Sequence, residues 1–153
     1  MPKTSAILRL PPDDPRFCFA MDIAVRDYEL DSEGIVNNAI YLHYLEHTRH
    51  TFCRQAGVSF RQMREAGYMP VANHIEVDYL HPLRSGNVVR SALYVEARGP
   101  RFVFHQHMFL PDGTPVLRAV VSIVTLNADG TLSHGDELKR HFASYLCHDG
   151  NRP

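Results

Sequence analysis

The chain has 153 residues, of which 44% are apolar and 22% are charged, and its formal net charge is -1. This length and composition fit one globular domain with a sizeable core, and the balanced charge favours neither a nucleic acid nor an anionic membrane as partner. No segment approaches the roughly 20 apolar residues of a membrane helix, and the start of the chain lacks the apolar core of a secretory signal.

Residues 1–16 contain a proline-rich run and are predicted to form an extended lead-in. From Phe17 to Arg26, large apolar side chains alternate with small or polar ones. A period of two is typical of a strand, and it turns the larger hydrophobic residues toward the core. The residues on this face are Phe17, Phe19, Met21, Ile23 and Val25.

The segment Asp31-Ser32-Glu33-Gly34 interrupts the strand, and the periodicity then becomes helical from about Asn38 to Ala56. Asn37 or Asn38 can cap the first turn, and Gly57 ends the helix. On a helical wheel, the apolar residues cover an arc wide enough to indicate a helix enclosed on more than one side. These residues are Ile40, Tyr41, Leu42, Tyr44, Leu45, Phe52, Cys53 and Ala56.

Four more strands and two shorter helices are predicted after the long helix. Turn signals separate the strand-like runs, and Asp112-Gly113 between two apolar runs favours a hairpin. The predicted strands lie near 70–80, 87–97, 101–110 and 115–126, and the helices near 59–66 and 136–146. This order predicts an α+β fold in which a curved, mostly antiparallel sheet of about five strands wraps around one long central helix, the hotdog arrangement. Residues 17–147 are expected to form this single domain, and residues 148–153 a flexible tail.

The loop before the long helix carries the motif Asp31-x-x-Gly34-Ile35-Val36, and an aromatic residue, Tyr41, follows in the helix. Together with the downstream run Tyr79-Leu80-x-Pro82-Leu83-x-Ser85-Gly86, this motif resembles the signature of the 4-hydroxybenzoyl-CoA thioesterase group of hotdog enzymes. The stretches Val25-Arg26-Asp27-Tyr28-Glu29-Leu30-Asp31 and Val36-Asn37-Asn38-Ala39 are similar to those of the short plant acyl-lipid thioesterases, which act on fatty acyl carrier protein. The likeness runs from about residue 21 to residue 127.

The resemblance implies an enzyme that hydrolyses an acyl thioester of coenzyme A or of an acyl carrier protein, without a cofactor or a metal. It assigns the role of nucleophile or general base to Asp31, and that of oxyanion donor to the backbone N–H of Asn38. Thioester hydrolysis needs a nucleophile or base at the carbonyl carbon and stabilisation of the developing oxyanion. A carboxylate before a helix meets the first need, and unsatisfied N–H groups at the helix start meet the second. Gly34 permits the tight path between them.

The substrate is expected to contact Gly34, Asn37, Tyr41 and Leu45. Tyr41 and Leu45 share the centre of the apolar arc with Phe52, so these residues either line an acyl tunnel or pack the core. The choice between the two stays open at the level of the sequence.

Other interpretations of the same loop remain open. Asp31 also fits the cap of a turn, and Glu33 would raise the pKa of Asp31 only if both carboxylates were buried. Many bacterial relatives have a histidine at the position of Asn38, so this chain does not favour a histidine-assisted mechanism. The main alternative function is a non-catalytic acyl-thioester-binding protein on the same fold. A hotdog hydratase or dehydratase, which places a histidine in the active loop or at the helix start, is a weaker alternative.

The histidines give no sign of a metal centre. His43 and His47 share one helix face, but the H-E-x-x-H pattern is missing and Arg54 lies in the same stripe, so a solvated or interface face is expected. Cys53 follows His50 by three residues and could pair with it as a nucleophile, yet its place at the edge of the apolar arc favours a buried structural thiol. The glycine loops of nucleotide sites and the serine-hydrolase elbow are not present in the sequence.

The widely spaced cysteines Cys18, Cys53 and Cys147 indicate reduced thiols, and hence a cytoplasmic protein. The resemblance implies a homodimer or a homotetramer made of two dimers, because each site of the family lies between two subunits. A small sheet of this kind also leaves an edge strand that pairing would cover. A thioester substrate is the expected partner, with no nucleic acid and no membrane.

Overall fold

The computed structural model describes residues 6–148, so residues 1–5 of the predicted lead-in and residues 149–153 of the predicted tail lie outside it. The strands in this range are β1 (Phe19–Ala24), β2 (Met69–Tyr79), β3 (Val88–Arg98), β4 (Arg101–Phe109) and β5 (Pro115–Leu126). The helices are α1 (Asn38–Gln55), α2 (Phe60–Glu65) and α3 (Asp136–Phe142), and a short 3-10 turn spans Asp27–Glu29.

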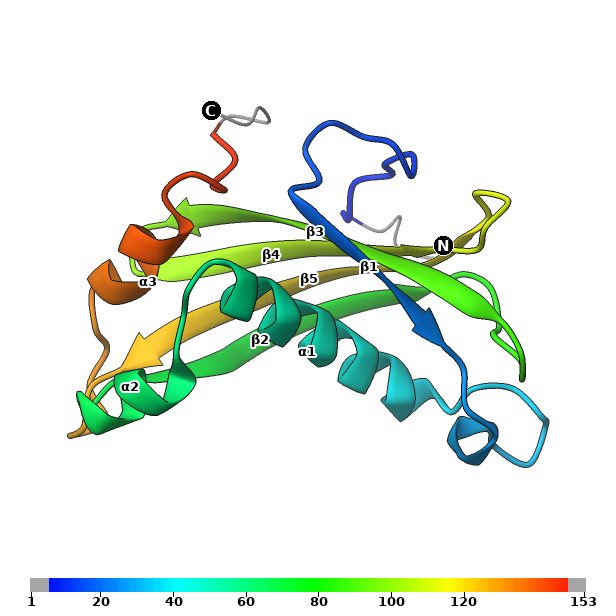
Figure 1. Cartoon of the computed structure of the whole chain (residues 1–153), viewed down its shortest axis with the longest axis horizontal. Coiled ribbons are helices and arrows are strands. Elements are labelled where there is room, and N and C mark those ends of the chain that lie inside the picture. The colour runs from blue at the N-terminus through cyan, green and yellow to red at the C-terminus, as the bar shows by residue number, and fades with distance from the viewer. Residues whose placement is uncertain (1–5, 149–153) are drawn as a thin grey trace.

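The strands form a single antiparallel sheet in the order β1-β3-β4-β5-β2. The sheet curves around α1, which lies along its concave side (Figure 1). The predicted fold, a curved sheet of five strands wrapped around one long helix, is therefore confirmed. The strand order makes β1 and β2 the two edges of the sheet.

The central helix α1 packs against the sheet along one stripe of side chains that recurs every three or four residues. Its buried members are Tyr41, Tyr44, Leu45, Thr48, Arg49, Phe52 and Cys53. Leu42, which was predicted to belong to the apolar arc, is exposed, so the single chain encloses the helix on one side and not on several. Two polar residues take places in the stripe because they find partners on the sheet. Thr48 Oγ1 shares a hydrogen bond of 2.7 Å with Ser91 Oγ, and Arg49 donates to Gln106 Oε1 at 2.9 Å.

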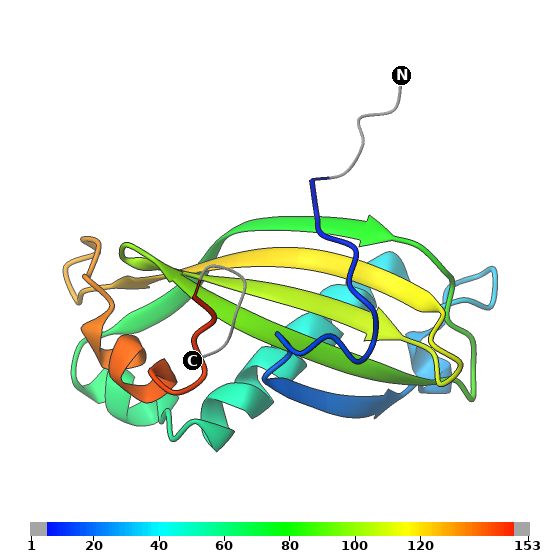
Figure 2. The ribbon, with the colours of Figure 1, turned by 90° about the horizontal axis from the view of Figure 1, so that it is seen from above.

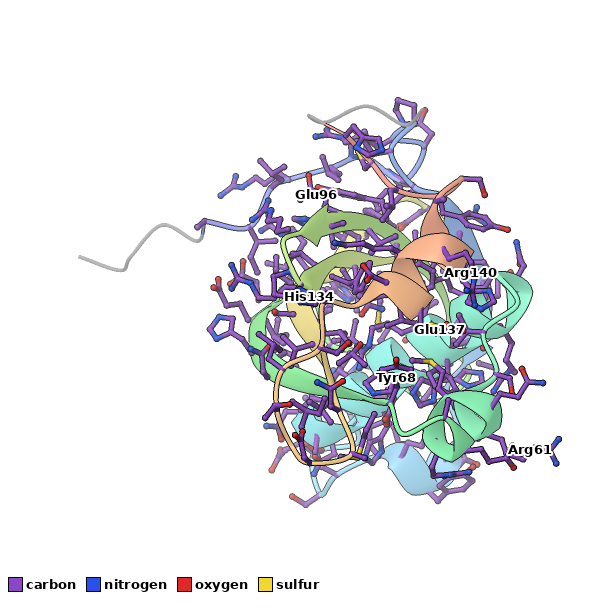
Figure 3. All side chains as sticks on the ribbon, turned by 90° about the vertical axis from the view of Figure 1, so that its left-hand side faces the viewer. Arg61, Tyr68, Glu96, His134, Glu137 and Arg140 are labelled. Carbon is purple, nitrogen blue, oxygen red and sulfur yellow. The ribbon has the colours of Figure 1, made fainter. Side chains whose placement is uncertain are left out.

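The two short helices close the end of the sheet farthest from the start of α1. Phe142 of α3 packs on Phe52 of α1 with ring centroids 5.3 Å apart. Figure 3 looks onto this end, where Glu137 and Arg140 of α3 form an ion pair of 2.8 Å. Helix α3 ends at Phe142 and is shorter than the predicted helix 136–146, because the chain beyond it turns and Leu146 forms a bridge with Val95.

The opposite face of the sheet is covered in part by the lead-in. Leu10 forms a small buried cluster with Tyr94 of β3 and Cys147, and Phe17 packs against it. Figure 2 shows the lead-in passing beside the strands on its way to β1. The sheet thus carries a helix on one face and an irregular segment on the other.

Candidate functional site

The loop between β1 and α1 folds into a small hairpin, in which Asp31 lies next to the base and residues 32–34 form the turn. Leu30 and Val36 form an antiparallel bridge at its base. Inside it, the Asp31 N–H donates to the Ile35 carbonyl at 2.8 Å, and the Gly34 N–H donates to the Asp31 carbonyl at 3.1 Å. Gly34 has φ +73°, a left-handed conformation that a residue with a side chain rarely adopts. The tight path expected at this glycine is therefore present.

The two oxygens of the Asp31 carboxylate have different surroundings. Oδ1 accepts hydrogen bonds from the N–H of Glu33 at 2.8 Å and, more weakly, from that of Ile35 at 3.4 Å. Oδ2 has no hydrogen-bond partner among residues 6–148, and the side chain is half-buried. Asp31 therefore caps its turn with one oxygen and leaves the other available, while Glu33 beside it is exposed.

The helix start supplies an N–H group next to this loop. Asn37 is the cap: its Oδ1 accepts from the Ala39 N–H at 2.9 Å and its carbonyl accepts from the Ile40 N–H at 2.9 Å. Asn38 is the first helical residue, where helix geometry provides no acceptor for the N–H. Its N–H therefore lies at the positive end of the helix dipole, within an exposed turn.

A buried carboxylate, Glu29, holds the loop in place, although its position in the sequence gives no sign of this. The residue is 6% exposed. Its Oε1 accepts from Tyr44 Oη at 2.8 Å and from the Arg26 N–H at 2.8 Å, and its carbonyl accepts from the Asn37 N–H at 3.0 Å. Burial, together with this carboxylate, raises the pKa of Tyr44 and keeps it a hydrogen-bond donor.

The second motif segment, residues 79–86, lies directly against the first. The Val36 N–H donates to the Leu83 carbonyl at 2.8 Å, and the Leu83 N–H donates to Tyr41 Oη at 3.1 Å. Ser85 Oγ donates to Asp27 Oδ1. The two segments that resembled one family signature are thus parts of one hydrogen-bonded unit.

Tyr79 joins this unit to the helix start. Its hydroxyl donates to the Asn38 carbonyl at 2.9 Å, and its ring meets that of Tyr41 edge-on at 5.4 Å. Tyr41 and Leu45 follow along the buried side of α1, in the core cluster nearest the loop. Burial raises the pKa of Tyr41, and the charge of Asp31 adds a smaller contribution. Whether Gly34, Asn37, Tyr41 and Leu45 contact a substrate stays a prediction.

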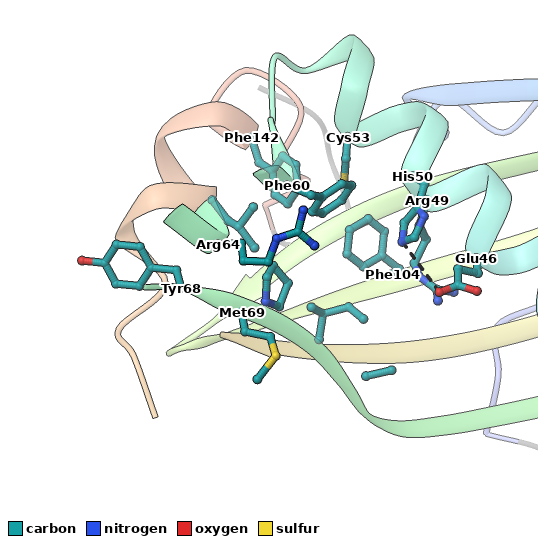
Figure 4. A pocket seen from close by; sticks show the side chains of 14 residues that line it. Glu46, Arg49, His50, Cys53, Phe60, Arg64, Tyr68, Met69, Phe104 and Phe142 are labelled. Atoms are coloured by element: carbon teal, nitrogen blue, oxygen red, sulfur yellow. Dashed lines mark ion pairs between the residues drawn. The ribbon is translucent and has the colours of Figure 1, made fainter. Parts of the chain in front are cut away.

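An apolar cavity of about 420 Å³ lies at the other end of α1, between that helix, α2, α3 and β2 (Figure 4). Arg49, His50 and Cys53 line it from α1. Fifteen residues of helix separate Asn38 from Cys53, or about 22 Å at the helical rise. Within one chain, this cavity is therefore remote from Asp31. Burial raises the pKa of Cys53 to about 12, which is the opposite of what a thiolate nucleophile needs, so a Cys53–His50 pair gains no support.

The described residues contain no group of three or more His, Cys, Asp and Glu side chains placed to hold a metal ion. In the same range, no helix has the length and apolar character needed to cross a membrane.

Comparisons with known proteins fit this architecture. Residues 25–143 match the model of the thioesterase-like superfamily. The chain is 36% identical over 101 residues to acyl-acyl carrier protein thioesterase ATL3, chloroplastic, of Arabidopsis thaliana, covering 65% of this chain and 53% of that protein. It is 35% identical over 132 residues to ATL2 of the same plant, covering 84% and 68%. The chain therefore spans only about half to two thirds of these relatives.

Among solved structures, Slr0204, a 1,4-dihydroxy-2-naphthoyl-CoA thioesterase from Synechocystis, superposes with a TM-score of 0.76. The sequence identity is 16%, and the match covers 86% of this chain and 96% of that one. At such an identity the likeness shows the fold alone.

Proposed function

Because this chain belongs to the thioesterase-like superfamily, we propose that it is an enzyme that hydrolyses an acyl thioester to the free acid and the thiol. The observation that supports the proposal is a carboxylate oxygen, Asp31 Oδ2, that has no hydrogen-bond partner within residues 6–148, in the loop that leads into a helix start whose first N–H has no intrahelical acceptor. The loop that presents the carboxylate is tied to the rest of the molecule by Glu29 and Leu83, so its geometry is fixed before a substrate arrives.

Two routes use the same groups. In the first, Asp31 Oδ2 attacks the carbonyl carbon, the C–S bond breaks, and water then hydrolyses the mixed anhydride. In the second, Asp31 removes a proton from a water molecule that attacks the carbon, and the thiolate leaves with that proton. Both routes place negative charge on the carbonyl oxygen, where the Asn38 N–H and the helix dipole would stabilise it.

The thiol carrier is coenzyme A or an acyl carrier protein. The plant relatives are named as acyl-acyl carrier protein thioesterases, which supports including the protein carrier. Gly34 and Asn37 would border the thioester, and Tyr41 and Leu45 would meet the acyl group on the inner side of α1. Because both side chains are buried in the single chain, an acyl group that reaches them must displace core packing.

The test is thiol release from a panel of acyl-CoA and acyl carrier protein substrates of increasing chain length. We expect turnover of at least one class well above the uncatalysed rate. Saturable binding of the same thioesters without thiol release would instead establish the second candidate, an acyl-thioester-binding protein on the same fold.

A further inference from the structure

A second cavity, also of about 420 Å³, lies on the face of the sheet that the lead-in covers. Its polar lining comes from the lead-in, the segment after β2, strand β4, the turn between β4 and β5, and strand β5: Arg9, His81, His107, Thr114 and Arg118. Leu10, Leu80 and Pro115 add apolar walls. The cavity lies across the sheet from α1, so the proposed hydrolysis does not use it.

Arg118 is a largely buried cation on this face of the sheet. The residue is 9% exposed, and its Nε is inaccessible to solvent and lacks a hydrogen bond within the described residues. Within residues 6–148 the guanidinium has neither a hydrogen bond nor an ion pair, although the strand register places Asp78 directly opposite. Of the guanidinium nitrogens only Nε is a buried atom without a partner, so the other two are left to solvent or to a ligand. Asp78 Oδ2, on the residue opposite, is also buried without a hydrogen-bond partner in the described range, so an anion at this site must compete with that carboxylate for Arg118.

His107 faces Arg118 across the β4–β5 ladder. It is 1% exposed, and its Nδ1 also has no hydrogen-bond partner in the described range. Burial, assisted by the charge of Arg118, lowers the pKa of His107 to about 4. The imidazole is therefore neutral near pH 7 and offers one N–H donor, and the positive charge beside it belongs to Arg118.

We propose that this cavity binds a phosphate-type oxyanion, held by the Arg118 guanidinium, with His107 and Arg9 as further donors. Arginine presents two parallel N–H groups that match two phosphate oxygens. Donors from three elements suit a tetrahedral anion, because a planar carboxylate offers only two oxygens. The apolar walls leave room for an organic group attached to the phosphate, so either free phosphate or a phosphate ester fits the chemistry.

The experiment is a calorimetric titration of the full chain with inorganic phosphate at pH 7 and constant ionic strength. Arg118→Gln should weaken binding by about tenfold or more, since a charge-assisted contact to a buried anion is lost. Arg101→Gln is the matched control, because Arg101 is exposed at the far end of β4 and does not line the cavity. Arg9→Gln, at an exposed position, should weaken binding several-fold and tests the site even if Arg118→Gln does not fold.

A parallel titration with coenzyme A separates the two sources of the anion. Binding of coenzyme A that depends on Arg118 indicates a phosphate ester, and binding of inorganic phosphate alone indicates a free anion. The proposal is overturned if wild type shows no saturable binding of either, or if Arg118→Gln and Arg101→Gln behave alike. It is also overturned if phosphate binds only to Asp78→Asn, because Arg118 then pairs with Asp78 in the native protein.

Discussion

The two oxygens of Asp31 have different surroundings, and a single substitution tests whether the second one takes part in the proposed hydrolysis. Asn at this position keeps an oxygen that accepts from the Glu33 N–H, so the turn should survive. It removes the charge and the basic lone pairs of the second oxygen. We expect Asp31→Asn to lower kcat by roughly a hundredfold or more, the usual contribution of general-base assistance. KM should change little, because the acyl group and the carrier are held elsewhere. Steady-state kinetics on the best substrate of the panel measures both.

Glu33→Gln is the matched control for this substitution, since Glu33 is an exposed carboxylate in the same loop. It should cost less than about tenfold in kcat, because a solvated charge interacts weakly with its neighbours. Equal and small effects of the two substitutions, with circular dichroism unchanged, would make Asp31 a turn residue only.

The histidine beside Arg118 predicts an acid-sensitive fold. The pKa of His107 is about 4 in the folded chain and 6.5 ordinarily, so between these values the unfolded chain binds more protons than the native one. The free energy of unfolding is therefore not reduced by His107 above pH 6.5. It falls as the pH drops toward 4, by roughly 3 kcal/mol in total. The charged or titratable groups around it are Arg118, His105, Asp14 and Arg16.

Urea unfolding at several pH values between 7 and 4.5 measures this effect. His107→Gln should show a shallower loss of unfolding free energy on acidification than wild type. His47→Gln, on the exposed face of α1, should keep the wild-type dependence. A wild-type slope in His107→Gln would contradict the assignment.

At single residues, local pattern and family resemblance located the Asp31 loop, and the structure shows Gly34 in its turn and Asn37 as the helix cap. The residues that hold the loop escaped notice because their partners are distant in the chain. Glu29 looks like any loop glutamate until α1 folds back and brings Tyr44 to it. Arg49 is a charged residue in a helix, for which the sequence gives no reason to expect burial, and only β4 supplies the Gln106 that lets it be buried.

At the scale of elements, periodicity and turn residues predict the five strands and the three α-helices of the described range, but not the 3-10 turn at Asp27–Glu29, which is too short to show a period. The width of the apolar arc predicts the buried side of α1 less well. Leu42 belongs to the arc but is exposed, because hydrophobicity alone does not determine which side of a helix packs on the sheet. The end of α3 was also misplaced, because the bridge from Leu146 to Val95 is a tertiary contact.

Substitution of Leu45 tests whether α1 determines the preferred acyl-chain length or only packs the core. It is fully buried, so Leu45→Ala should destabilise the fold by about 2–5 kcal/mol. If α1 also lines the acyl site, the preferred chain length should shift toward longer substrates, because the cavity left by the leucine accepts extra methylene groups. Urea unfolding and the substrate panel measure the two effects. A loss of stability with an unchanged chain-length profile would support packing alone.

At the scale of the molecule, β2 is an edge strand that carries large, solvent-exposed apolar side chains. Ile75 is 41% exposed, and Met69 and Tyr79 are exposed on the same strand. Edge strands of this kind invite pairing with another chain. We therefore expect at least a homodimer in solution, and light scattering on an active preparation should give twice the chain mass or more.

A charge at this edge tests where the second copy binds. Ile75→Lys should shift the protein toward monomer, whereas Leu8→Lys, at an exposed apolar position on the lead-in, should leave the mass unchanged. An active wild-type monomer would refute the oligomer altogether.

The hydrogen bond from Val36 to Leu83 has a consequence for the order of folding. It closes a loop of chain that contains α1, α2 and β2, so its formation carries the entropy cost of a long-range contact. A ribosome-bound chain that has not yet released residue 83 lacks the carbonyl that fixes the Asp31 hairpin. We therefore expect the hairpin to order late, after β3 has docked on β1. In pulse-labelled hydrogen exchange, the Val36 amide should gain protection after the amides of the β4–β5 ladder.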